Sequence, residues 1–299
     1  MKPFVNIIIL NWNNFEDTLE CVNSIIKNKY KNYGITIVDN GSTDDSLSNL
    51  NKVFSKIDKI KILVSNKNLG FAEGNNFGMR KDLFKKSDFF LLLNNDTIVD
   101  KFAIKNMLNE ILSKNVIGVI SPRIYDYYNH SEISKVDYPG KFNLCLGGGT
   151  IDKSGKKFNK QCFVDYTSGC CWLIRRKIYL ENKGFNKKYF AYFEEVEWAY
   201  RINKSGYKFY LTPHAKIWHK GARTSKNIKG FKLFYQSRNN IWFERQYANT
   251  LQYSIFIIIL FLYKIPKNIL RIFLARKNMK VKLKSYFKGI KEGFTGNYC

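Results

Sequence analysis

The first 120 residues alternate between short apolar runs and stretches with helical spacing, and this alternation limits the fold more than any other feature of the chain. Runs rich in Ile, Val, Leu and Phe predict buried strands, and apolar residues three or four positions apart predict helices between them. Strands that alternate with helices form a mostly parallel sheet with flanking helices, so we expect a Rossmann-like α/β fold. The predicted strands cover residues 4–10, 35–38, 61–64, 89–93 and 116–120, and the predicted helices lie within residues 19–26, 47–54 and 102–112.

The pattern is less regular after residue 120. Three consecutive glycines, Gly147 to Gly149, predict a flexible loop over a binding site. A helix is expected from Glu194 to Lys204, because Ser205 and Gly206 form a typical helix end. The other expected elements are regular structure near residues 162–176, a strand at residues 208–211 and a loop that holds His214 and His219.

Positive charge is concentrated near the C-terminus. The formal net charge is +26, of which +15 lies in residues 220–299, because this segment contains 17 Lys and Arg but only two acidic residues. Such a charge favours an anionic partner, which is nucleic acid, a phosphorylated small molecule or an anionic membrane surface; a solvated surface is the alternative. No zinc-finger spacing or RNP-type motif occurs, so we expect no nucleic acid.

An apolar run precedes most of this charge. Leu251–Tyr263 spans 13 residues, fewer than the roughly 20 that cross a bilayer. Ten Lys and Arg follow between Lys264 and Lys291 among apolar side chains, a composition typical of amphipathic helices on an anionic leaflet. We therefore expect residues 246–299 to form a basic amphipathic helical tail. A tail that forms a homodimer is the alternative.

The N-terminus and the cysteines indicate the compartment. The chain begins Met1-Lys2-Pro3 and continues directly into the first predicted strand, without the features of a signal peptide. The six cysteines are scattered with no C-x-x-C pair, which favours free thiols in a reducing cytosol. We expect a cytoplasmic protein.

Polar residues directly follow four of the predicted strands. The carboxyl ends of parallel strands meet at one edge of a sheet, where ligands bind. Asp39 ends a buried strand, so its carboxylate could accept a hydrogen bond from a ligand such as the N–H of a pyrimidine ring. The alternative is a local helix cap formed with Ser42 and Asp45. The four polar segments are residues 11–13, 39–42, 66–78 and 94–96, and none fits a P-loop or a G-x-G-x-x-G motif.

Asp96 and His219 are candidate metal ligands. Asp96 emerges from an apolar strand beside the amide of Asn95, and Mg²⁺ or Mn²⁺ is typically held by one or two carboxylates plus substrate phosphates. An Asx turn is the alternative for Asp96. His219 could complete a metal shell, and the cations of Lys220 and Arg223 after it could meet phosphate.

Three carboxylates, Glu194, Glu195 and Glu197, begin the expected helix among aromatic residues. They could simply complement the helix dipole. The aromatic neighbours would also desolvate a carboxylate and raise its pKa toward that of a general base. Because adjacent residues on a helix point in different directions, we expect one of Glu194 and Glu195 to be catalytic and the other to cap the helix or pair with an arginine. The candidate arginines are Arg175, Arg176 and Arg201.

Seven motifs occur in a fixed order between residues 4 and 245. They are Val5–Asn13, Val38–Asp44, Asn66–Asn76, Leu93–Thr97, Gly169–Arg176, Phe193–Trp198, and His219 followed by Tyr235 and Arg238-Asn239. In this order they resemble a family 2 glycosyltransferase of the GT-A type, particularly its rhamnosyltransferase-like branch. Two positions depart from the family pattern: Asn94 stands first in the D-x-D motif, and Glu197 stands where Asp is usual.

The resemblance implies an inverting enzyme that moves a sugar from a dTDP- or UDP-linked donor, rhamnose among the candidates, to a hydroxyl of a cell-envelope glycan or lipid-linked saccharide. Residues 1–120 would be the nucleotide-binding half and residues 121–245 the acceptor and catalytic half of one GT-A domain. Glu195 would be the general base, and Asp96 and His219 would hold Mg²⁺ or Mn²⁺. The residues implied at the nucleotide are Asn11, Asp39, Asn68, Gly70, Gly74 and Asn95, and those implied at the acceptor or phosphate are Glu194, Trp198, Arg223 and Arg238.

The implied partners are a nucleotide-sugar donor, a saccharide acceptor and, through residues 246–299, the anionic inner face of the cell membrane. The protein would then be peripherally bound to that membrane. A non-catalytic basic adaptor that binds a nucleotide or an anionic lipid is the alternative function.

Overall fold

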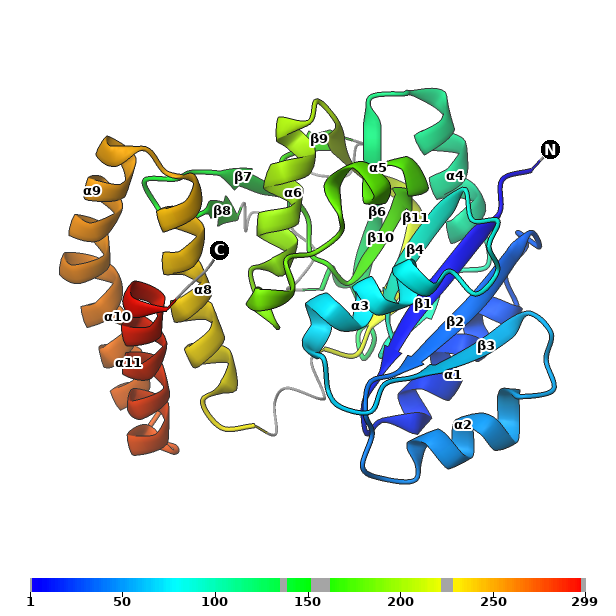
Figure 1. Cartoon of the computed structure of the whole chain (residues 1–299), viewed down its shortest axis with the longest axis horizontal. Helices are drawn as coiled ribbons and strands as arrows, with labels where there is room; N and C mark the ends of the chain where they lie inside the picture. Colours follow the sequence, from blue (N-terminus) through cyan, green and yellow to red (C-terminus); the bar gives the residue numbers. More distant parts are fainter. Residues whose placement is uncertain (1, 135–138, 152–161, 222–227, 297–299) are drawn as a thin grey trace.

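A mixed sheet of nine strands forms the centre of the molecule, with helices on both of its faces (Figure 1). The computed structural model describes residues 2–134, 139–151, 162–221 and 228–296. Four strands pair in parallel in the order β3-β2-β1-β4, which confirms the predicted α/β pattern, and the order continues β10-β6-β11-β5 with β9 beside β11. The strands of this sheet are β1 Val5–Asn11, β2 Tyr33–Asp39, β3 Ile60–Val64, β4 Phe89–Asn94, β5 Thr97–Val99, β6 Ile117–Asp126, β9 Cys162–Val164, β10 Cys171–Arg175 and β11 Lys208–His219; β7 Gly140–Phe142 and β8 Gly149–Ile151 form a separate pair.

The sheet is more mixed than the sequence indicates. Strand β10 enters antiparallel between β4 and β6, and β5 and β9 pair antiparallel with β11. Strand β11 extends to His219, so the loop expected around His214 and His219 is wrong. The register of β11 with β6 shifts between Thr212 and Lys216, where Pro213 cannot donate to the ladder. This interruption explains why the sequence indicates only the first residues of the strand.

Successive residues of the central strands face two different layers of helices. On β1, Ile7 and Ile9 belong to a core with α1, α2 and α4, whereas Ile8 belongs to a core with α3, α5 and α6. Such strands are apolar along their whole length because both faces of the sheet are covered. The helices around the sheet are α1 Phe15–Ile26, α2 Ser46–Phe54, α3 Gly70–Lys81, α4 Ala103–Ser113, α5 Arg176–Asn182, η1 Lys187–Tyr189 and α6 Glu194–Lys204.

Helix α3 begins within the polar segment 66–78, where the sequence predicts no helix. Its glycines recur at every fourth position, and each costs about 1 kcal/mol of helix propensity relative to Ala. A Cβ at Gly74 would lie 2.6 Å from Cδ1 of Leu10, and a Cβ at Gly78 would lie 2.7 Å from Cγ2 of Ile8. The glycines therefore let the helix lie directly against β1. Because glycine has a low helix propensity, the same glycines explain why the sequence does not predict this helix.

Four helices, α8 to α11, lie together at the end of the molecule opposite β3 (Figure 1). They have their own core, and among the described residues no helix is both long and apolar enough to cross a membrane. The sequence predicts a boundary between the catalytic domain and the tail at residue 245. Helix α8 continues across this position, and the boundary stays a prediction. The elements are α8 Phe231–Tyr247, α9 Thr250–Ile259, the π-helical turn η2 Leu260–Lys264, α10 Ile265–Leu274 and α11 Met279–Thr295.

The glycine segment at 147–149 is held in place by these helices. Asn240 on α8 donates a hydrogen bond to the carbonyl of Gly147 at 2.7 Å, and Lys264 donates to the carbonyl of Leu146 at 2.7 Å. Gly148 is buried. No residue of this segment is among those that line the cleft described below, so its place over the site stays a prediction.

Candidate active site

A cleft of about 350 Å³ opens where β1, β2 and β4 end, at the edge of the sheet that the sequence predicts for a ligand. Its other walls are the start of α3, residues 168–170 and the turn at 190–195 that leads into α6. Ile228 and Phe231, at the start of the four-helix unit, complete the lining. Segments from the whole chain therefore meet at one site. The polar side chains that line it are Asn40, Asn68, Asn94, Asn95, Asp96, Ser168, Tyr192, Glu194 and Glu195.

Asp39 and Asn11 are buried beside this lining and are not part of it. The carboxylate of Asp39 accepts hydrogen bonds from Nδ2 of Asn11 at 3.0 Å, and from the backbone N–H and hydroxyl of Ser42 at 3.1 and 2.7 Å. The alternative helix cap is not formed, because α2 begins at Ser46 and Asp45 makes no capping hydrogen bond. Asp39 thus orders the turn next to the cleft, and its contact with a nucleobase stays a prediction.

Asn40 is a site residue that sequence reasoning missed. Its Oδ1 accepts from the N–H of Leu69 at 3.0 Å, and its Nδ2 donates to Oδ1 of Asn68 and to the carbonyl of Gly70, both at 3.2 Å. Asn68 in turn accepts from the N–H of Gly70 at 2.8 Å. The motif around Asp39 contains Asn40, but motif spacing does not show that its amide orders a loop some 30 residues away.

Gly70 and Gly74 permit close approach, as predicted, but the approaching groups are the protein's own. A Cβ at Gly70 would lie 2.5 Å from the carbonyl oxygen of Phe190, and the φ of Gly70, +77°, is in the left-handed region that favours glycine. Gly74 packs on Leu10 and does not line the cleft. Gly70 does line it, so a nucleotide contact stays a prediction for Gly70 and Asn68.

Asp96, in the turn between β4 and β5, lines the cleft and contacts His219 at the end of β11, which lies behind this lining. Oδ1 of Asp96 lies 3.1 Å from Nε2 of His219, and their side chains are 8% and 5% exposed. The pairing of β11 with β5 and a 2.9 Å hydrogen bond from the N–H of Lys220 to the carbonyl of Asp96 hold the two segments together. Burial opposes a charged imidazole, but Cys170 and Asp96 outweigh it and raise the pKa of His219 to about 11. Cys170 is a cleft residue that the sequence did not single out.

The donor set around Asp96 fits a divalent cation that also binds a substrate. Asp96 supplies a carboxylate, His219 an imidazole, and Asn94 and Asn95 line the same cleft with amide oxygens. The described part of the chain has no group of three or more His, Cys, Asp or Glu that could hold a metal. A cation on Asp96 and His219 would therefore need further ligands, and substrate phosphates are the usual ones.

Glu194 and Glu195 both line the cleft, so the expectation that only one of them faces the site is wrong. Both begin α6, and the residue before them, Phe193, is left-handed with φ +74°. This entry into the helix lets two consecutive side chains reach the same space. The arginines expected as partners bind elsewhere: Arg201 lies 2.7 Å from Glu197, Arg176 lies 3.8 Å from Asp82, and Arg175 donates to the carbonyl of Ile117 at 2.8 Å.

The two carboxyl groups differ in acidity. Burial raises the pKa of Glu194 well above its usual range, and the charge of Glu195 raises it further. Burial also raises the pKa of Glu195, but the backbone N–H groups of Glu195 and Phe193 lower it in part. Both groups therefore keep a proton to higher pH than an ordinary Glu, and because the two carboxyls interact, the pair loses its protons in two successive steps.

A strained turn presents these acids to the cleft. Phe190, Tyr192 and Phe193 have φ values of +62°, +63° and +74°, and such left-handed backbone costs roughly 1–3 kcal/mol for each non-glycine residue. Nδ2 of Asn239, on α8, lies 2.6 to 3.0 Å from three carbonyl oxygens of the turn. Arg238 beside it donates to the carbonyls of Lys188 and Tyr189, at 3.0 and 3.1 Å, and the second of these is also bonded by Asn239. Helix α8 thus holds the turn in place.

Two of the residues implied at the acceptor or phosphate do not line the cleft. The guanidinium of Arg238 is used by the strained turn and packs 4.1 Å from the ring centre of Trp242. Trp198 is fully buried against Trp172 and Phe185, because it lies on the side of α6 that faces the sheet. Arg223 lies outside the described residues.

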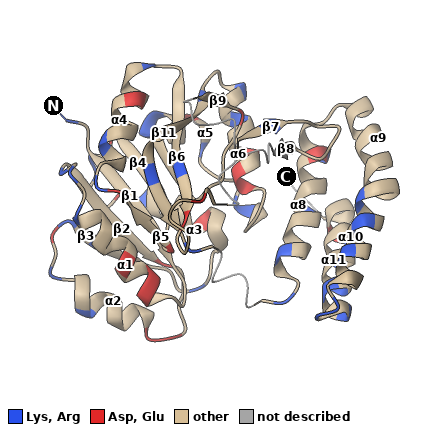
Figure 2. Cartoon of the chain, turned by 180° about the vertical axis from the view of Figure 1, so that it is seen from behind, with Lys and Arg blue, Asp and Glu red and all other residues tan. Residues whose placement is uncertain are grey.

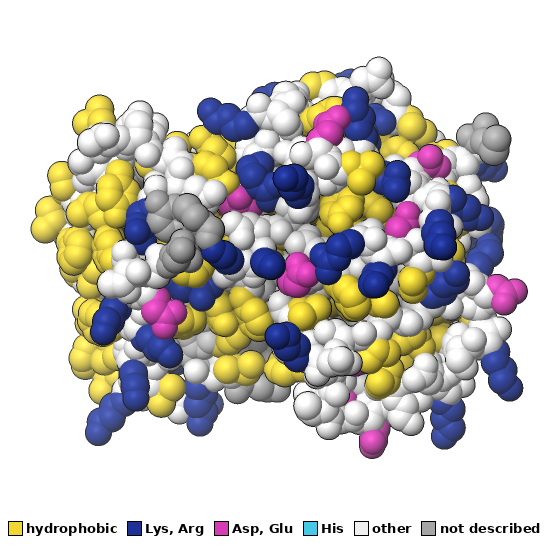
Figure 3. Space-filling view, in the orientation of Figure 1, with side chains coloured by type: hydrophobic (Ala, Val, Ile, Leu, Met, Phe, Trp, Pro, Cys, Tyr) yellow, Lys and Arg dark blue, Asp and Glu magenta, His cyan; other side chains and the backbone are white. Residues whose placement is uncertain are grey.

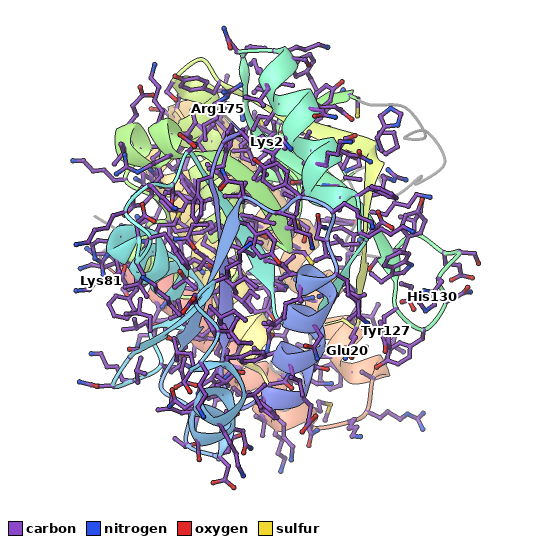
Figure 4. The ribbon with its side chains drawn as sticks, turned by 90° about the vertical axis from the view of Figure 1, so that its right-hand side faces the viewer. Lys2, Glu20, Lys81, Tyr127, His130 and Arg175 are labelled. Carbon is purple, nitrogen blue, oxygen red and sulfur yellow. The ribbon has the colours of Figure 1, made fainter. Side chains whose placement is uncertain are left out.

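Lys220 is also committed elsewhere, although the sequence suggests that it meets phosphate. Its ammonium lies 2.7 Å from Oδ1 of Asp17 and also contacts Glu20. Glu20 accepts a 2.8 Å hydrogen bond from the hydroxyl of Tyr127, and Figure 4 shows these two side chains next to each other. The network ties the end of β11 to α1 and so supports the position of His219.

Comparison with known proteins identifies the family. Residues 6–182, more than half of the chain, match the model for glycosyl transferase family 2. The chain belongs to glycosyl transferase family 2. This confirms the resemblance drawn from the motifs, and family membership together with the buried acid pair in the cleft argues against a non-catalytic adaptor.

Relatives of this glycosyltransferase carry different names. A low-salt glycan biosynthesis hexosyltransferase, Agl10 of Haloferax volcanii, is 28% identical over 68% of this chain and 63% of its own. Glycosyltransferase GlyG of Streptococcus pneumoniae is 26% identical over 44% of this chain and 42% of its own. An N-acetylglucosaminyl-diphospho-decaprenol L-rhamnosyltransferase of Mycobacterium tuberculosis is 28% identical over 31% of this chain and 33% of its own. The chain therefore spans less than two thirds of each of these relatives.

Solved structures confirm the fold. GalNAc-T7, crystallised with UDP, GalNAc and Mn²⁺, superimposes with a TM-score of 0.62 at 16% identity, over 83% of this chain and 52% of its own. TarS residues 1–349 of S. aureus superimpose with a TM-score of 0.57 at 13% identity, over 98% of this chain and 92% of theirs. At these identities the likeness concerns the fold alone.

Asn239→Ala is expected to lower kcat of this glycosyltransferase more than it raises KM, because the strained turn would no longer present Glu194 and Glu195 correctly. The loss of its bonds to buried carbonyls should also destabilise the protein by about 1–3 kcal/mol. Asn240→Ala is the matched control, since its neighbouring amide binds Gly147 instead. Steady-state kinetics and thermal denaturation of both variants test this. Equal kinetic losses in the two variants would contradict the positioning role of Asn239.

Proposed function

We propose that the protein is an inverting glycosyltransferase that moves a sugar from a dTDP- or UDP-linked donor to a hydroxyl of a cell-envelope glycan or lipid-linked saccharide. The observation that carries this proposal is that Asp96, which contacts His219, and the Glu194–Glu195 pair line one cleft. The first suits a diphosphate with its cation, and the second suits removal of a proton. Rhamnose is a candidate sugar because a relative carries the name of an L-rhamnosyltransferase.

The donor would lie along the wall formed by Asn40, Asn68 and Asn95, with its diphosphate at Asp96 and His219. These two residues would hold Mg²⁺ or Mn²⁺, which when bound neutralises charge on the departing nucleoside diphosphate. Asp39 would reach the nucleobase only if the turn that it orders opens, because its oxygens are already bonded within that turn.

Glu195 would act as the general base. Its carboxylate takes the proton of the acceptor hydroxyl while that oxygen forms a bond to the anomeric carbon of the sugar. The bond from the anomeric carbon to the diphosphate breaks on the opposite side, and the nucleoside diphosphate leaves with the electron pair. Glu194 keeps its proton and can donate a hydrogen bond to a sugar or acceptor oxygen.

The name of one relative supports a lipid-linked acceptor. The rhamnosyltransferase relative is named for a diphospho-decaprenol, which is a lipid-linked saccharide. We therefore also propose that the enzyme works at the inner face of the cell membrane as a peripheral protein. A homodimer formed through the C-terminal helices is the competing proposal.

A thermal-shift screen against nucleotide sugars tests the donor. A nucleotide sugar at 100 times its Kd is expected to stabilise the protein by about 2.7 kcal/mol, and more strongly in the presence of Mn²⁺. The corresponding nucleoside monophosphate is the control, because it lacks the diphosphate that Asp96 and His219 would meet. The proposal fails if no nucleotide sugar raises the midpoint and none is consumed when acceptor lipids are added.

A further inference from the structure

Large apolar side chains are exposed along one side of α9, η2 and α10. Leu262 is 77% exposed, Leu274 72% and Leu251 70%. Figure 3 shows such side chains along the left-hand edge of the molecule, over these helices. We call this surface the tail face, and it consists of Leu251, Ile258, Phe261, Leu262, Tyr263, Leu270, Phe273 and Leu274.

The residues of the tail face are not needed to form the core of the four-helix unit. The four-helix unit already has an interior, to which Phe256, Leu260 and Ile272 contribute from the same helices. Each helix thus has one apolar side turned inward and further apolar side chains turned outward. Contiguous exposed apolar surface of this kind marks an interaction site in a soluble domain.

Basic side chains border the tail face. Between Arg245 and Lys291 the chain has no Asp or Glu. Figure 2 shows Lys and Arg gathered on α10 and α11, particularly toward the turn that joins these helices. The exposed basic residues next to the tail face are Lys267, Arg271, Arg276, Lys277, Lys280 and Lys284.

This distribution of charge selects the partner. A second copy of the chain docked by the same face would bring two basic borders together without any acid to pair them, which is unfavourable. An anionic lipid leaflet offers phosphates for the basic border and hydrocarbon for the apolar side chains. An anionic leaflet therefore matches both the apolar side chains of the tail face and its basic border.

The helices suit an interfacial position. Helices α9, η2 and α10 follow one another without a break from Thr250 to Leu274, but Lys264, Lys267 and Arg271 interrupt their apolar side chains. Among the described residues no helix is long and apolar enough to cross a membrane. Lys267 donates a 2.7 Å hydrogen bond to the hydroxyl of Tyr263. This pair places a phenol ring and an ammonium group together, as is common where protein meets the headgroup layer.

We propose that the tail face docks on an anionic leaflet, with Leu262, Leu270 and Leu274 in the boundary between headgroups and acyl chains and the basic border on the lipid phosphates. The proposal rests on the membrane association proposed above and names the surface and the lipid chemistry that provide it. Helix α8 links this surface to the cleft, since it packs on α9 and α11 and also supplies Phe231 to the cleft and Asn239 to the strained turn.

Flotation of the full-length protein with vesicles tests the proposal. The wild type is expected to float with phosphatidylcholine vesicles that contain ~30% phosphatidylglycerol and to stay unbound with phosphatidylcholine alone. The double variant Leu262→Glu/Leu274→Glu should bind the anionic vesicles about tenfold or more weakly, and Arg276→Glu/Lys277→Glu should also bind more weakly and lose its dependence on salt. Leu180→Glu is the matched control, because Leu180 is 55% exposed on α5, outside the tail face.

Circular dichroism and the thermal midpoint confirm that each variant is folded, and light scattering gives its oligomeric state. Equal flotation of the wild type and Leu262→Glu/Leu274→Glu would overturn the proposal, as would a wild type that does not bind anionic vesicles. A change from dimer to monomer in Leu262→Glu/Leu274→Glu with unchanged flotation would assign the face to self-association instead. None of these readouts uses sugar transfer, so a failure here leaves the proposed reaction standing.

Discussion

Glu195→Gln is expected to lower kcat for sugar transfer by about 10²- to 10⁴-fold and to leave the Kd of the nucleotide sugar unchanged. Gln keeps the shape of the side chain but cannot take the proton of the acceptor hydroxyl. Single-turnover kinetics with a saturating donor measure the chemical step, and calorimetry measures donor binding. A parallel loss of binding would show that Glu195 holds the donor rather than activating the acceptor.

The pH dependence of the wild type follows from the same assignment. The base must be ionised, and the pKa of Glu195 is raised by burial above the 4.5 of an ordinary Glu. The acid limb of kcat/KM should therefore fall at a pH above the usual carboxyl range. The limb should be absent from the residual activity of Glu195→Gln.

Glu194→Gln is the matched control within the pair. Glu194 holds the proton in our assignment, and Gln can also donate a hydrogen bond, so most of kcat should remain. The folded-state pKa of Glu194 lies above its unfolded value, so its contribution to stability is present at low pH and is lost as the pH rises through the folded pKa. Because Gln does not titrate, the thermal midpoint of the variant should exceed that of the wild type increasingly toward high pH. If Glu194→Gln is the inactive variant and Glu195→Gln is active, the two roles are exchanged.

The sequence predicts elements whose signal is local. The buried strands β1 to β4 appear as apolar runs because both faces of the sheet are covered, and α6 matches its predicted ends because Ser205 and Gly206 terminate it. Helix α3 is missed for an equally local reason. Its glycines serve contact with Leu10 and Ile8, and that contact is invisible in one sequence.

The site is predicted less completely because its geometry depends on distant partners. The motifs find Asp96, Glu194 and Glu195, which line one cleft, and His219, which contacts Asp96. The motifs also include Arg238 and Asn239, but a role at phosphate is the natural interpretation of an arginine in a basic segment. Only the fold shows that these side chains bind carbonyls some 50 residues away and hold the turn before α6.

Asp96→Asn is expected to lower transfer by about 10²- to 10³-fold, because it removes the anionic ligand from a site whose other candidate ligands are amides and an imidazole that must first lose its proton. Asn94 already stands where the family pattern has an acid, so Asp96 is the carboxylate on which metal affinity depends most. High Mn²⁺ should restore part of the activity of Asp96→Asn, since weakened binding can be offset by concentration. Asp100→Asn is the matched control: Asp96 and Asp100 flank the short strand β5, and the carboxylate of Asp100 accepts a 2.8 Å hydrogen bond from the N–H of Phe102, away from the cleft lining.

Removal of the metal tests the same site without a mutation. Excess EDTA should abolish transfer by the wild type, and added Mg²⁺ or Mn²⁺ should restore it, because two protein ligands cannot hold the cation against a strong chelator. Titration of Mn²⁺ by electron paramagnetic resonance should show weak binding to the protein alone and tighter binding once a nucleoside diphosphate supplies the missing oxygens. Full turnover in excess EDTA would refute the metal assignment, and Asp96 and His219 would then act on the diphosphate as a hydrogen-bonded pair, with His219 as the donor.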